Sequence, residues 1–254
     1  MKRYGILLMA LVLSCSQKNP AAENNANQTA TENNKVSEST KPVNTVAAIP
    51  APVTQKNQIR FDFEKAAVGS LPAGWSAHKT GPGNNIKWAV VQDGTNKALG
   101  QLTKSNPNSH FNVVTYDSII AKNVHLKTRF KSISGRMDQG GGFVWRYQNP
   151  ENYYLVRANS LEGNVVLYKV QNGKRTDLPL VGKGRTYGAD AKVPTKTWHD
   201  LELEARDNLF IVSINGKELF RVNDTTFTGA GKVGFWTKSD AYTYFDNFEI
   251  NVLP

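Results

Sequence analysis

The sequence is short of the residues that several protein classes need: it has one cysteine, three methionines and four histidines among 254 residues. A single cysteine excludes an intrachain disulfide, and the histidines lack the i, i+2 or i+4 partner expected of a zinc centre. No Gly-x-Ser-x-Gly elbow and no convincing amphipathic helix of three turns occur. These absences argue against disulfide-stapled, zinc-dependent and helical proteins.

Acidic residues are also in deficit, with 21 Asp and Glu against 31 Lys and Arg, which gives a net charge of +10 and a pI of about 9.6. A nucleic-acid site requires the basic residues to cluster in a stripe or to form a recognisable motif. Here they are scattered along the chain. We therefore expect a mildly basic, solvated surface and no nucleic-acid partner.

No apolar run is long enough to cross a bilayer, but a short one at Ile6–Leu13 follows Lys2 and Arg3 and is followed by Ser14 and Cys15. This is the pattern of a secretory signal. The residues Leu-Val-Leu-Ser-Cys at 11–15 resemble the bacterial lipobox, which implies a signal peptide over residues 1–14 and a lipidated Cys15. An ordinary signal with an incidental cysteine is the alternative, and the lack of a second cysteine argues against it.

Residues 15–57 contain almost no large apolar side chain, so we expect a disordered tether that cannot offset its ordering entropy. With several acyl chains on Cys15, this segment would hold the protein at a membrane. Ser16 and Gln17 do not resemble an inner-membrane retention signal. The expected location is the bacterial cell envelope, with the outer membrane favoured over the inner one.

Residues 58–254 form one expected domain, because they alternate apolar and polar residues in short runs separated by turn formers. The clearest runs are Phe143–Tyr147, Tyr153–Ala158 and Val165–Val170, and Asn215-Gly216 is a strong signal for a two-residue hairpin. The other expected strands are Ile59–Glu64, Trp88–Gln92, Ala98–Leu102, Asn112–Tyr116, Val124–Phe130, Trp198–Ala205, Phe210–Ile214, Leu219–Val222, Gly231–Thr237 and Tyr242–Val252. About a dozen short strands predict an all-β antiparallel sandwich or barrel.

The stretches GGFVWRYQNPENYYLVRA, VSINGKELF, GKVGFWTK and YFDNFEI, together with Thr197-Trp198-His199, resemble the concanavalin A-like lectin/glucanase superfamily. Within it, the chain is most similar to bacterial domains called 3-keto-disaccharide hydrolase-like, also labelled laminin-G-like or family 16 glycoside hydrolase-like. The resemblance covers Ile59–Val252. It implies a jelly-roll sandwich of two curved antiparallel sheets whose concave face binds carbohydrate in many relatives.

Planar polar and aromatic side chains of the central strands are the candidates for a sugar site. Strict alternation would place Arg146 opposite the large aromatics of its strand, and Tyr153 and Arg157 would share one face of the next strand. We expect these three residues to form a concave patch, with Lys169, Arg136, Asp138 and Gln139 at its edge. The equally weighted alternative is that they only solvate the outside of the sandwich.

The carboxylates of the sequence give weaker evidence for a catalytic or metal site than the aromatic and polar residues give for a sugar site. The Glu-x-Asp-x-(x)-Glu pattern of the family 16 glucanases is missing, and Glu202 and Glu204 lie opposite an apolar set, so they should face solvent. Asp62, Glu64 and Asp246 on terminal strands are candidate ligands of a structural calcium, which relatives of the fold often hold. Charges that protect edge strands are the competing explanation. No other cofactor is expected.

The leading functional hypothesis is an envelope lipoprotein whose jelly-roll domain binds carbohydrate without catalysis. A glycoside hydrolase of the 3-keto-disaccharide hydrolase-like type and a structural or protein-interaction module remain open. An enzyme should bring at least two carboxylates together in a concave cleft, whereas a lectin should expose aromatic and amide groups there. The glycan and the oligomeric state do not follow from the sequence.

Overall fold

The computed structural model describes residues 58–254, which belong to the second of two units of the chain, 52–254. The predicted signal peptide, the lipidated Cys15 and the tether lie outside these residues. Residues 58–254 consist of strands and turns without a helix, so no helix in them is long and apolar enough to cross a membrane. The all-β prediction is confirmed.

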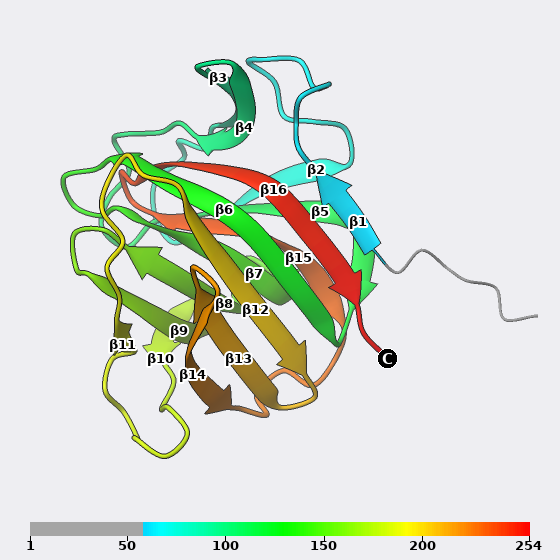
Figure 1. Cartoon of the computed structure of the whole chain (residues 1–254), viewed down its shortest axis with the longest axis vertical. Coiled ribbons are helices and arrows are strands. Elements are labelled where there is room, and N and C mark those ends of the chain that lie inside the picture. Colours follow the sequence, from blue (N-terminus) through cyan, green and yellow to red (C-terminus); the bar gives the residue numbers. More distant parts are fainter. Residues whose placement is uncertain (1–57) are drawn as a thin grey trace, which may run out of the picture. The chain divides into compact units, whose positions relative to one another are not determined.

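Sheet A forms one layer of the domain (Figure 1). Its strands are antiparallel, and β1 (Gln58–Phe61) pairs with β16. In spatial order sheet A contains β14 (Lys217–Asn223), β13 (Leu209–Ile214), β12 (His199–Arg206), β6 (Val124–Ser134), β16 (Tyr242–Val252), β4 (Asn96–Gln101) and β3 (Trp88–Asp93).

Sheet B forms the second layer and is also antiparallel, with the short β11 (Ala189–Asp190) paired to β9. Strands far apart in sequence lie side by side in it, as β15 does between β5 and β7. In spatial order sheet B contains β10 (Lys174–Asp177), β9 (Asn164–Gln171), β8 (Asn152–Asn159), β7 (Gly140–Asn149), β15 (Gly231–Lys238), β5 (Phe111–Ala121) and β2 (Trp75–Thr80).

The main core fills the space between the sheets. Along β12, Leu201, Leu203 and Ala205 are fully buried, whereas Glu202 and Glu204 between them are half-buried on the outer side. The predicted solvent-side position of these glutamates is confirmed. Phe235 lies at the centre of the core, with its ring 4.3 Å from that of Phe245 and 4.5 Å from that of Phe248. Such contacts between aromatic rings stabilise a sandwich interior beyond simple burial.

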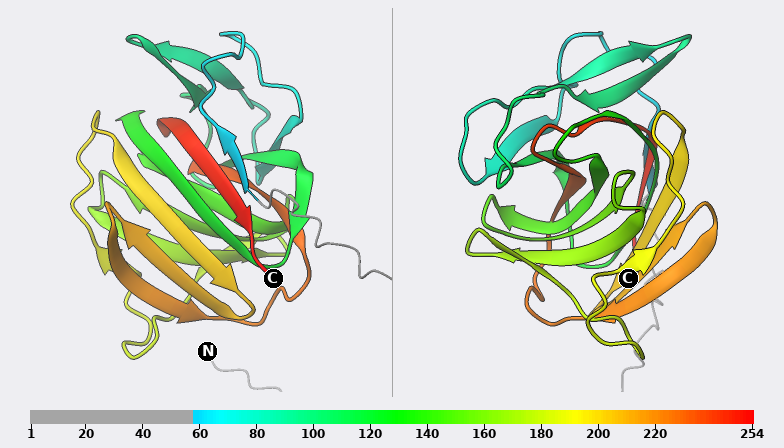
Figure 2. Two further views of the ribbon diagram at one scale, coloured as in Figure 1. Left: turned by 45° about the vertical axis from the view of Figure 1, so that its right-hand side comes forward. Right: turned by 90° about the vertical axis from the view of Figure 1, so that its left-hand side faces the viewer.

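Sheet B is strongly curled, and the right-hand view of Figure 2 shows its yellow-green strands bent into an arc. Strands β10 and β5 are five spacings apart in the sheet, which would be roughly 24 Å if the sheet were flat. Yet the guanidinium of Arg175 on β10 lies 5.1 Å from the ring centre of Phe111 on β5. Likewise, Thr80 on β2 is 2.8 Å from the hydroxyl of Tyr153 on β8. The face of sheet B turned away from sheet A is therefore concave, and its two ends meet.

The predicted strands correspond to observed ones, and the Asn215-Gly216 turn joins β13 to β14 with positive φ at both residues, as a two-residue hairpin turn requires. Three strands were not predicted. The first, β2 (Trp75–Thr80), directly follows the turn formers Pro72-Ala73-Gly74, and β10 and β11 are only four and two residues long. The jelly-roll prediction is confirmed.

Candidate functional site

A second apolar cluster fills the concave face of sheet B. Tyr153, Leu155 and Val166 are fully buried there although no second sheet covers them. The curl explains this, because side chains from the two ends of the curled sheet, which we call its arms, cover one another. Tyr153 lies on the face that alternation predicts, but its ring is enclosed between Thr80 and Tyr147 and presents no surface to a ligand.

A groove remains open where the arms of the curl meet. It has a volume of about 510 Å³ and lies between the turns after β2 and before β5 on one side and the β9–β10 hairpin on the other. Asn172 and Gly173 in that hairpin both have positive φ, which makes a tight turn and brings β10 directly over the concave face. The groove is lined by Gly81, Pro82, Asn108, Ser109, Phe111, Gly173, Arg175 and Lys238.

Arg175 stacks on three aromatic rings at this groove. Its guanidinium carbon lies 4.5 Å from the ring centre of Tyr168, 5.1 Å from that of Phe111 and 5.5 Å from that of Trp236. A cation near an aromatic face is attracted by the ring quadrupole, so the three rings help to hold the guanidinium at the groove. The Trp236 ring is fully buried in the second apolar cluster and lies next to Arg175 on the concave side.

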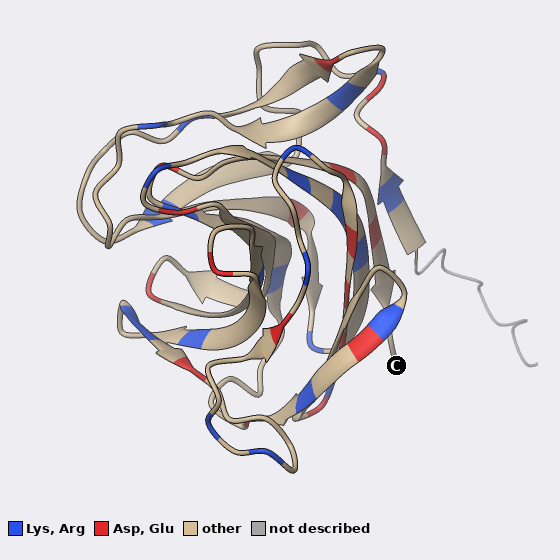
Figure 3. Ribbon diagram, turned by 60° about the vertical axis from the view of Figure 1, so that its left-hand side comes forward, with Lys and Arg blue, Asp and Glu red and all other residues tan. Residues whose placement is uncertain are grey.

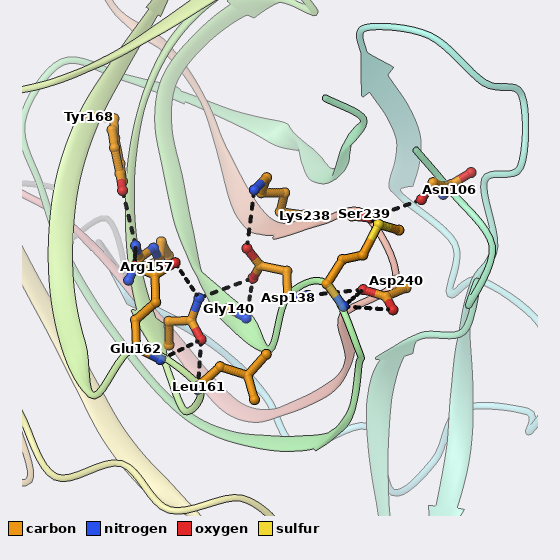
Figure 4. Close-up of polar contacts among 12 residues, drawn as sticks. Asn106, Asp138, Gly140, Arg157, Leu161, Glu162, Tyr168, Lys238, Ser239 and Asp240 are labelled. Atoms are coloured by element: carbon orange, nitrogen blue, oxygen red, sulfur yellow. Dashed lines mark hydrogen bonds and ion pairs between the residues drawn. The ribbon is translucent and has the colours of Figure 1, made fainter. Parts of the chain in front are cut away.

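A polar cluster adjoins the groove and is drawn in Figure 4. Lys238 lies 3.5 Å from Asp138, and Arg157 pairs with Glu162 at 2.6 Å. The side-chain amide of Asn159 donates to both carboxylates, at 3.3 Å to Asp138 and 3.2 Å to Glu162. These two carboxylate oxygens are therefore no further apart than the sum of the two distances, 6.5 Å.

Asp138 is almost fully buried in this cluster, and it also accepts a hydrogen bond of 2.6 Å from the backbone amide of Gly140. Burial raises the pKa of the Asp138 carboxyl above its ordinary value, because the charged form loses hydration. The Gly140 hydrogen bond and the charge of Lys238 act in the opposite direction without cancelling that effect, and the charge of Glu162 reinforces it. Asp138 is thus buried, whereas the Glu162 side chain is exposed.

Tyr187 adds an exposed ring beside the cluster. It is 45% exposed, and its ring packs edge-on against Tyr168 at 6.0 Å. The guanidinium of Arg157 lies 5.7 Å from Tyr168 and 5.8 Å from Tyr187. We call the series Phe111, Arg175, Tyr168, Arg157 and Tyr187 the stacked band, because each member contacts the next. It runs from the groove to the solvent-exposed Tyr187.

Arg146 is not on the concave face, and the predicted alternation was wrong at this position. The residue has a φ of 46°, and the pairing of β7 with β8 and with β15 shifts register around it, so a β-bulge redirects its side chain. The guanidinium lies 5.4 Å from the Phe210 ring and donates to the backbone carbonyls of Lys122, Phe227 and Asp207. These contacts serve the structure of the domain.

Lys169 also lies on the other side of sheet B from the candidate patch. Its neighbours Tyr168 and Val170 face the concave side, so Lys169 points the opposite way and contacts Asp224 and Thr226. Arg136 and Gln139 line a separate depression that also contains Thr195, which donates to Gln139 at 2.8 Å. Of the seven predicted residues, only Tyr153, Arg157 and Asp138 therefore lie on the concave side.

The candidate calcium ligands each have another partner. Asp246 pairs with Arg129, Glu64 accepts from the backbone amide of Lys97, and Asp62 accepts from that of Glu64. Within residues 58–254, no group of three or more His, Cys, Asp or Glu side chains is placed to hold a metal. The calcium prediction gains no support from these contacts and stays a prediction.

The members of the site that sequence reasoning missed include Phe111, Glu162, Tyr168, Arg175, Tyr187 and Lys238. Phe111 and Lys238 stand at the ends of their strands, and Arg175 lies on a strand too short to recognise. Their proximity depends on the curl, which no local pattern encodes. Only Tyr187 gave a usable signal, as a single aromatic residue in a polar, Gly-containing loop. Over the domain as a whole, basic and acidic positions are intermingled (Figure 3).

Comparison with known proteins decides the family. The family model of the 3-keto-alpha-glucoside-1,2-lyase-like domain matches residues 62–251. The chain belongs to this family. The predicted resemblance is confirmed, and the matched region contains the whole stacked band. No curated protein matches the chain as a relative.

Solved structures of the same fold accompany this match. The carbohydrate-binding module CBM66 from Bacillus subtilis is 16% identical, with a TM-score of 0.54 over 69% of this chain and 94% of that one. The cellulose-induced protein Cip1 is 13% identical, with a TM-score of 0.56 over 76% and 96%. The GH43 protein BlXynB from Bacillus licheniformis is 16% identical, with a TM-score of 0.50 over 76% of this chain but 39% of that one. At such identities the likeness establishes the fold alone.

Proposed function

We propose that this domain binds carbohydrate along the stacked band, from the groove at Arg175 to the exposed ring of Tyr187, and does so without catalysis of its own. The observation that carries the proposal is the band itself. Its accessible members are the exposed Tyr187 ring and the half-buried Arg175 guanidinium, which offer a planar face and hydrogen-bond donors beside a groove of about 510 Å³. Sugars bind by stacking their C–H faces on rings while polar side chains bond their hydroxyl groups.

The polar lining of the groove supports the proposal. Asn108 and Ser109 supply an amide and a hydroxyl, and Lys238 supplies an ammonium donor. The carbohydrate-binding module CBM66, which has the same fold, is consistent with this proposal. A sugar recognised in this way needs no perturbed acid or base.

The test is calorimetric binding of a glycan panel to the full chain and to Tyr187→Ala. Loss of one stacking ring should weaken binding about tenfold. The matched control is Val181→Ala, which trims an exposed apolar side chain on the same connection between β10 and β11. Equal binding by the Tyr187 variant would remove the band from the site. If no glycan binds at all, a protein-interaction or structural role becomes the better account.

Catalysis is the second candidate function, and the Asp138–Glu162 pair is the observation that favours it. Two carboxyl oxygens within 6.5 Å approach the spacing of about 5–5.5 Å between carboxyl groups used by retaining glycosidases. The family description names a lyase of a keto-sugar glycoside, and elimination also needs a base and an acid. We place catalysis second because the Asn159 amide and the Arg157 guanidinium occupy the space beside the pair.

Product analysis separates the two functions. The full chain would be incubated with glycosides and with their 3-keto derivatives, with Asp138→Asn and Glu162→Gln as variants. Our leading proposal expects no product from any of the three proteins. Product released by the unmodified chain and lost in both variants would establish catalysis at this pair and overturn the non-catalytic proposal.

We also propose that the chain is a lipoprotein of the bacterial cell envelope, anchored through acyl chains on Cys15 and favouring the outer membrane. The support is the basic, apolar and small-residue order of residues 2–15. Several acyl chains together give stable attachment, whereas one gives only marginal binding.

A further inference from the structure

Arg175 differs from most arginines of the described domain in having no acidic partner. Within residues 58–254, six other arginines lie close to a carboxylate, and Arg146 donates to three backbone carbonyls. Arg175 makes its contacts with rings, and its guanidinium donates no hydrogen bond to any described residue. The six paired arginines are Arg60, Arg129, Arg157, Arg185, Arg206 and Arg221.

Three rings lie 4.5–5.5 Å from the guanidinium carbon, and no described residue accepts a hydrogen bond from its N–H groups. A stacked guanidinium keeps its N–H groups in one plane, and this fork matches the two oxygens of a carboxylate or the oxygens of a sulfate. The three rings also displace water from one side of the cation, which strengthens its attraction for an anion. Arg175 thus lies at the groove without an anionic partner among the described residues.

The rest of the groove reinforces this charge. Lys238 lines the same groove and is itself largely buried. The carboxylate near it, Asp138, already has Lys238, Gly140 and Asn159 as partners. No acidic side chain is among the eight residues that line the groove. The lining therefore carries two cations and no anion of its own.

We infer that the sugar bound at this groove is anionic, with a carboxylate or sulfate group held by Arg175 and Lys238. The inference rests on the proposed function and gives its ligand a chemical class. The anion bonds the Arg175 guanidinium, and the rest of the glycan extends over the surface towards the exposed Tyr187. A neutral sugar would leave Arg175 without a counter-charge, whereas Lys238 already has Asp138.

The experiment measures binding of the full chain to galacturonic-acid oligosaccharides and to the same oligosaccharides with methyl-esterified carboxyl groups. We expect binding of the acid form and at least tenfold weaker binding of the ester, because hydrogen bonds to charged groups are the stronger ones. Sulfated galactan oligosaccharides form a third arm. Their tighter binding would assign the anion to a sulfate, and tighter binding of the uronate would assign it to a carboxylate.

Variants decide whether the groove is responsible. Arg175→Gln should weaken binding of the acidic glycan at least tenfold, and Arg175→Lys should restore little because a lysine lacks the planar fork. The matched control is Lys174→Gln, which removes the same charge from the exposed neighbouring residue and should bind as the unmodified chain does. Circular dichroism of each variant verifies that it is folded.

Three outcomes would overturn the inference. Equal binding of the methyl ester would show that the glycan site does not select an anion, and the proposed function would stand. If Arg175→Gln binds the acidic glycan as tightly as the unmodified chain does, the binding comes from the overall net charge of +10 and not from this groove. Absence of binding to charged and neutral glycans alike would overturn both this inference and the proposed function.

Discussion

Arg146 carries a buried charge that is satisfied entirely by backbone oxygens. Its three acceptors belong to three separate turns, at Lys122, Asp207 and Phe227. The guanidinium has five donors in one plane, which lets it bond three carbonyls at once. The residue therefore ties these turns to the bulge of β7, close to the Phe210 ring.

Replacing Arg146 should lower stability sharply. Arg146→Met leaves three carbonyl acceptors without their donor, and we expect a loss on the order of 3 kcal/mol in the free energy of unfolding. Urea denaturation measures it. Arg206→Met, at an exposed arginine beside Glu204, is the control and should change stability by less than about 0.5 kcal/mol. Similar effects of the two substitutions would contradict the structural role of Arg146.

Asp224 gives the domain a defined sensitivity to acid. Burial alone would raise the pKa of Asp224, but hydrogen bonds from Thr226, Tyr154 and Lys169 hold it below its ordinary value. The ionised form is thus the one that the folded state stabilises. Its contribution is complete above the unfolded pKa of about 3.9 and is lost as the pH falls through the lower folded value.

We expect Asp224→Asn to be less stable than the unmodified chain at pH 7 and to lose less further stability between pH 5 and pH 2. Urea midpoints across this range measure the difference. Asp190→Asn, at an exposed aspartate, is the control and should follow the unmodified chain. Parallel pH profiles for Asp224→Asn and the unmodified chain would contradict the assignment.

At the scale of elements, the curl of sheet B determines which residues meet. Gly142 and Gly234 show how closely its strands approach, since a Cβ at either position would lie about 2 Å from a carbonyl oxygen, that of Val156 or Val114. Any other residue there would push the strands apart. Thr80 then closes the curl by bonding the Tyr153 hydroxyl and the carbonyl of Pro150.

Removing the Tyr153 hydroxyl tests this closure. Tyr153→Phe should lower the free energy of unfolding by about 1 kcal/mol, because one buried hydrogen bond is lost and Thr80 keeps its bond to Pro150. Thermal unfolding measures the effect. Tyr116→Phe is the control, as the Tyr116 hydroxyl bonds no residue within the described part of the chain. No loss in Tyr153→Phe would mean that the contact does not help to close the curl.

The strands were predictable because each depends on a local alternation. Leu201, Leu203 and Ala205 show this well, since they are buried as their spacing requires. The site was not predictable in the same way. Period-two alternation fails at a bulge, which moved Arg146 to the other face. It also says nothing of contacts between distant strands, and these bury Tyr153 and bring Arg175 to Phe111.

At the scale of the whole molecule, the proposed anchor can be tested by cell fractionation. We expect the unmodified chain in the membrane fraction and Cys15→Ser in the soluble fraction, because the variant offers no thiol for acylation. Incorporation of a labelled fatty acid should be lost in parallel. Ser37→Ala, in the expected tether, retains the thiol and the signal and is the control. Membrane recovery of Cys15→Ser without label would overturn the lipoprotein proposal.

The meeting of the two arms of sheet B also bears on aggregation. Edge strands expose unpaired backbone groups that can recruit a strand from another chain. In sheet B the edge strands are β2 and β10, and the groove lies between the turn after β2 and the hairpin that leads into β10. Each edge thus faces the other arm of its own sheet, and β10 is short and carries the exposed Lys174. The curvature that forms the groove therefore also protects the domain from edge-to-edge association.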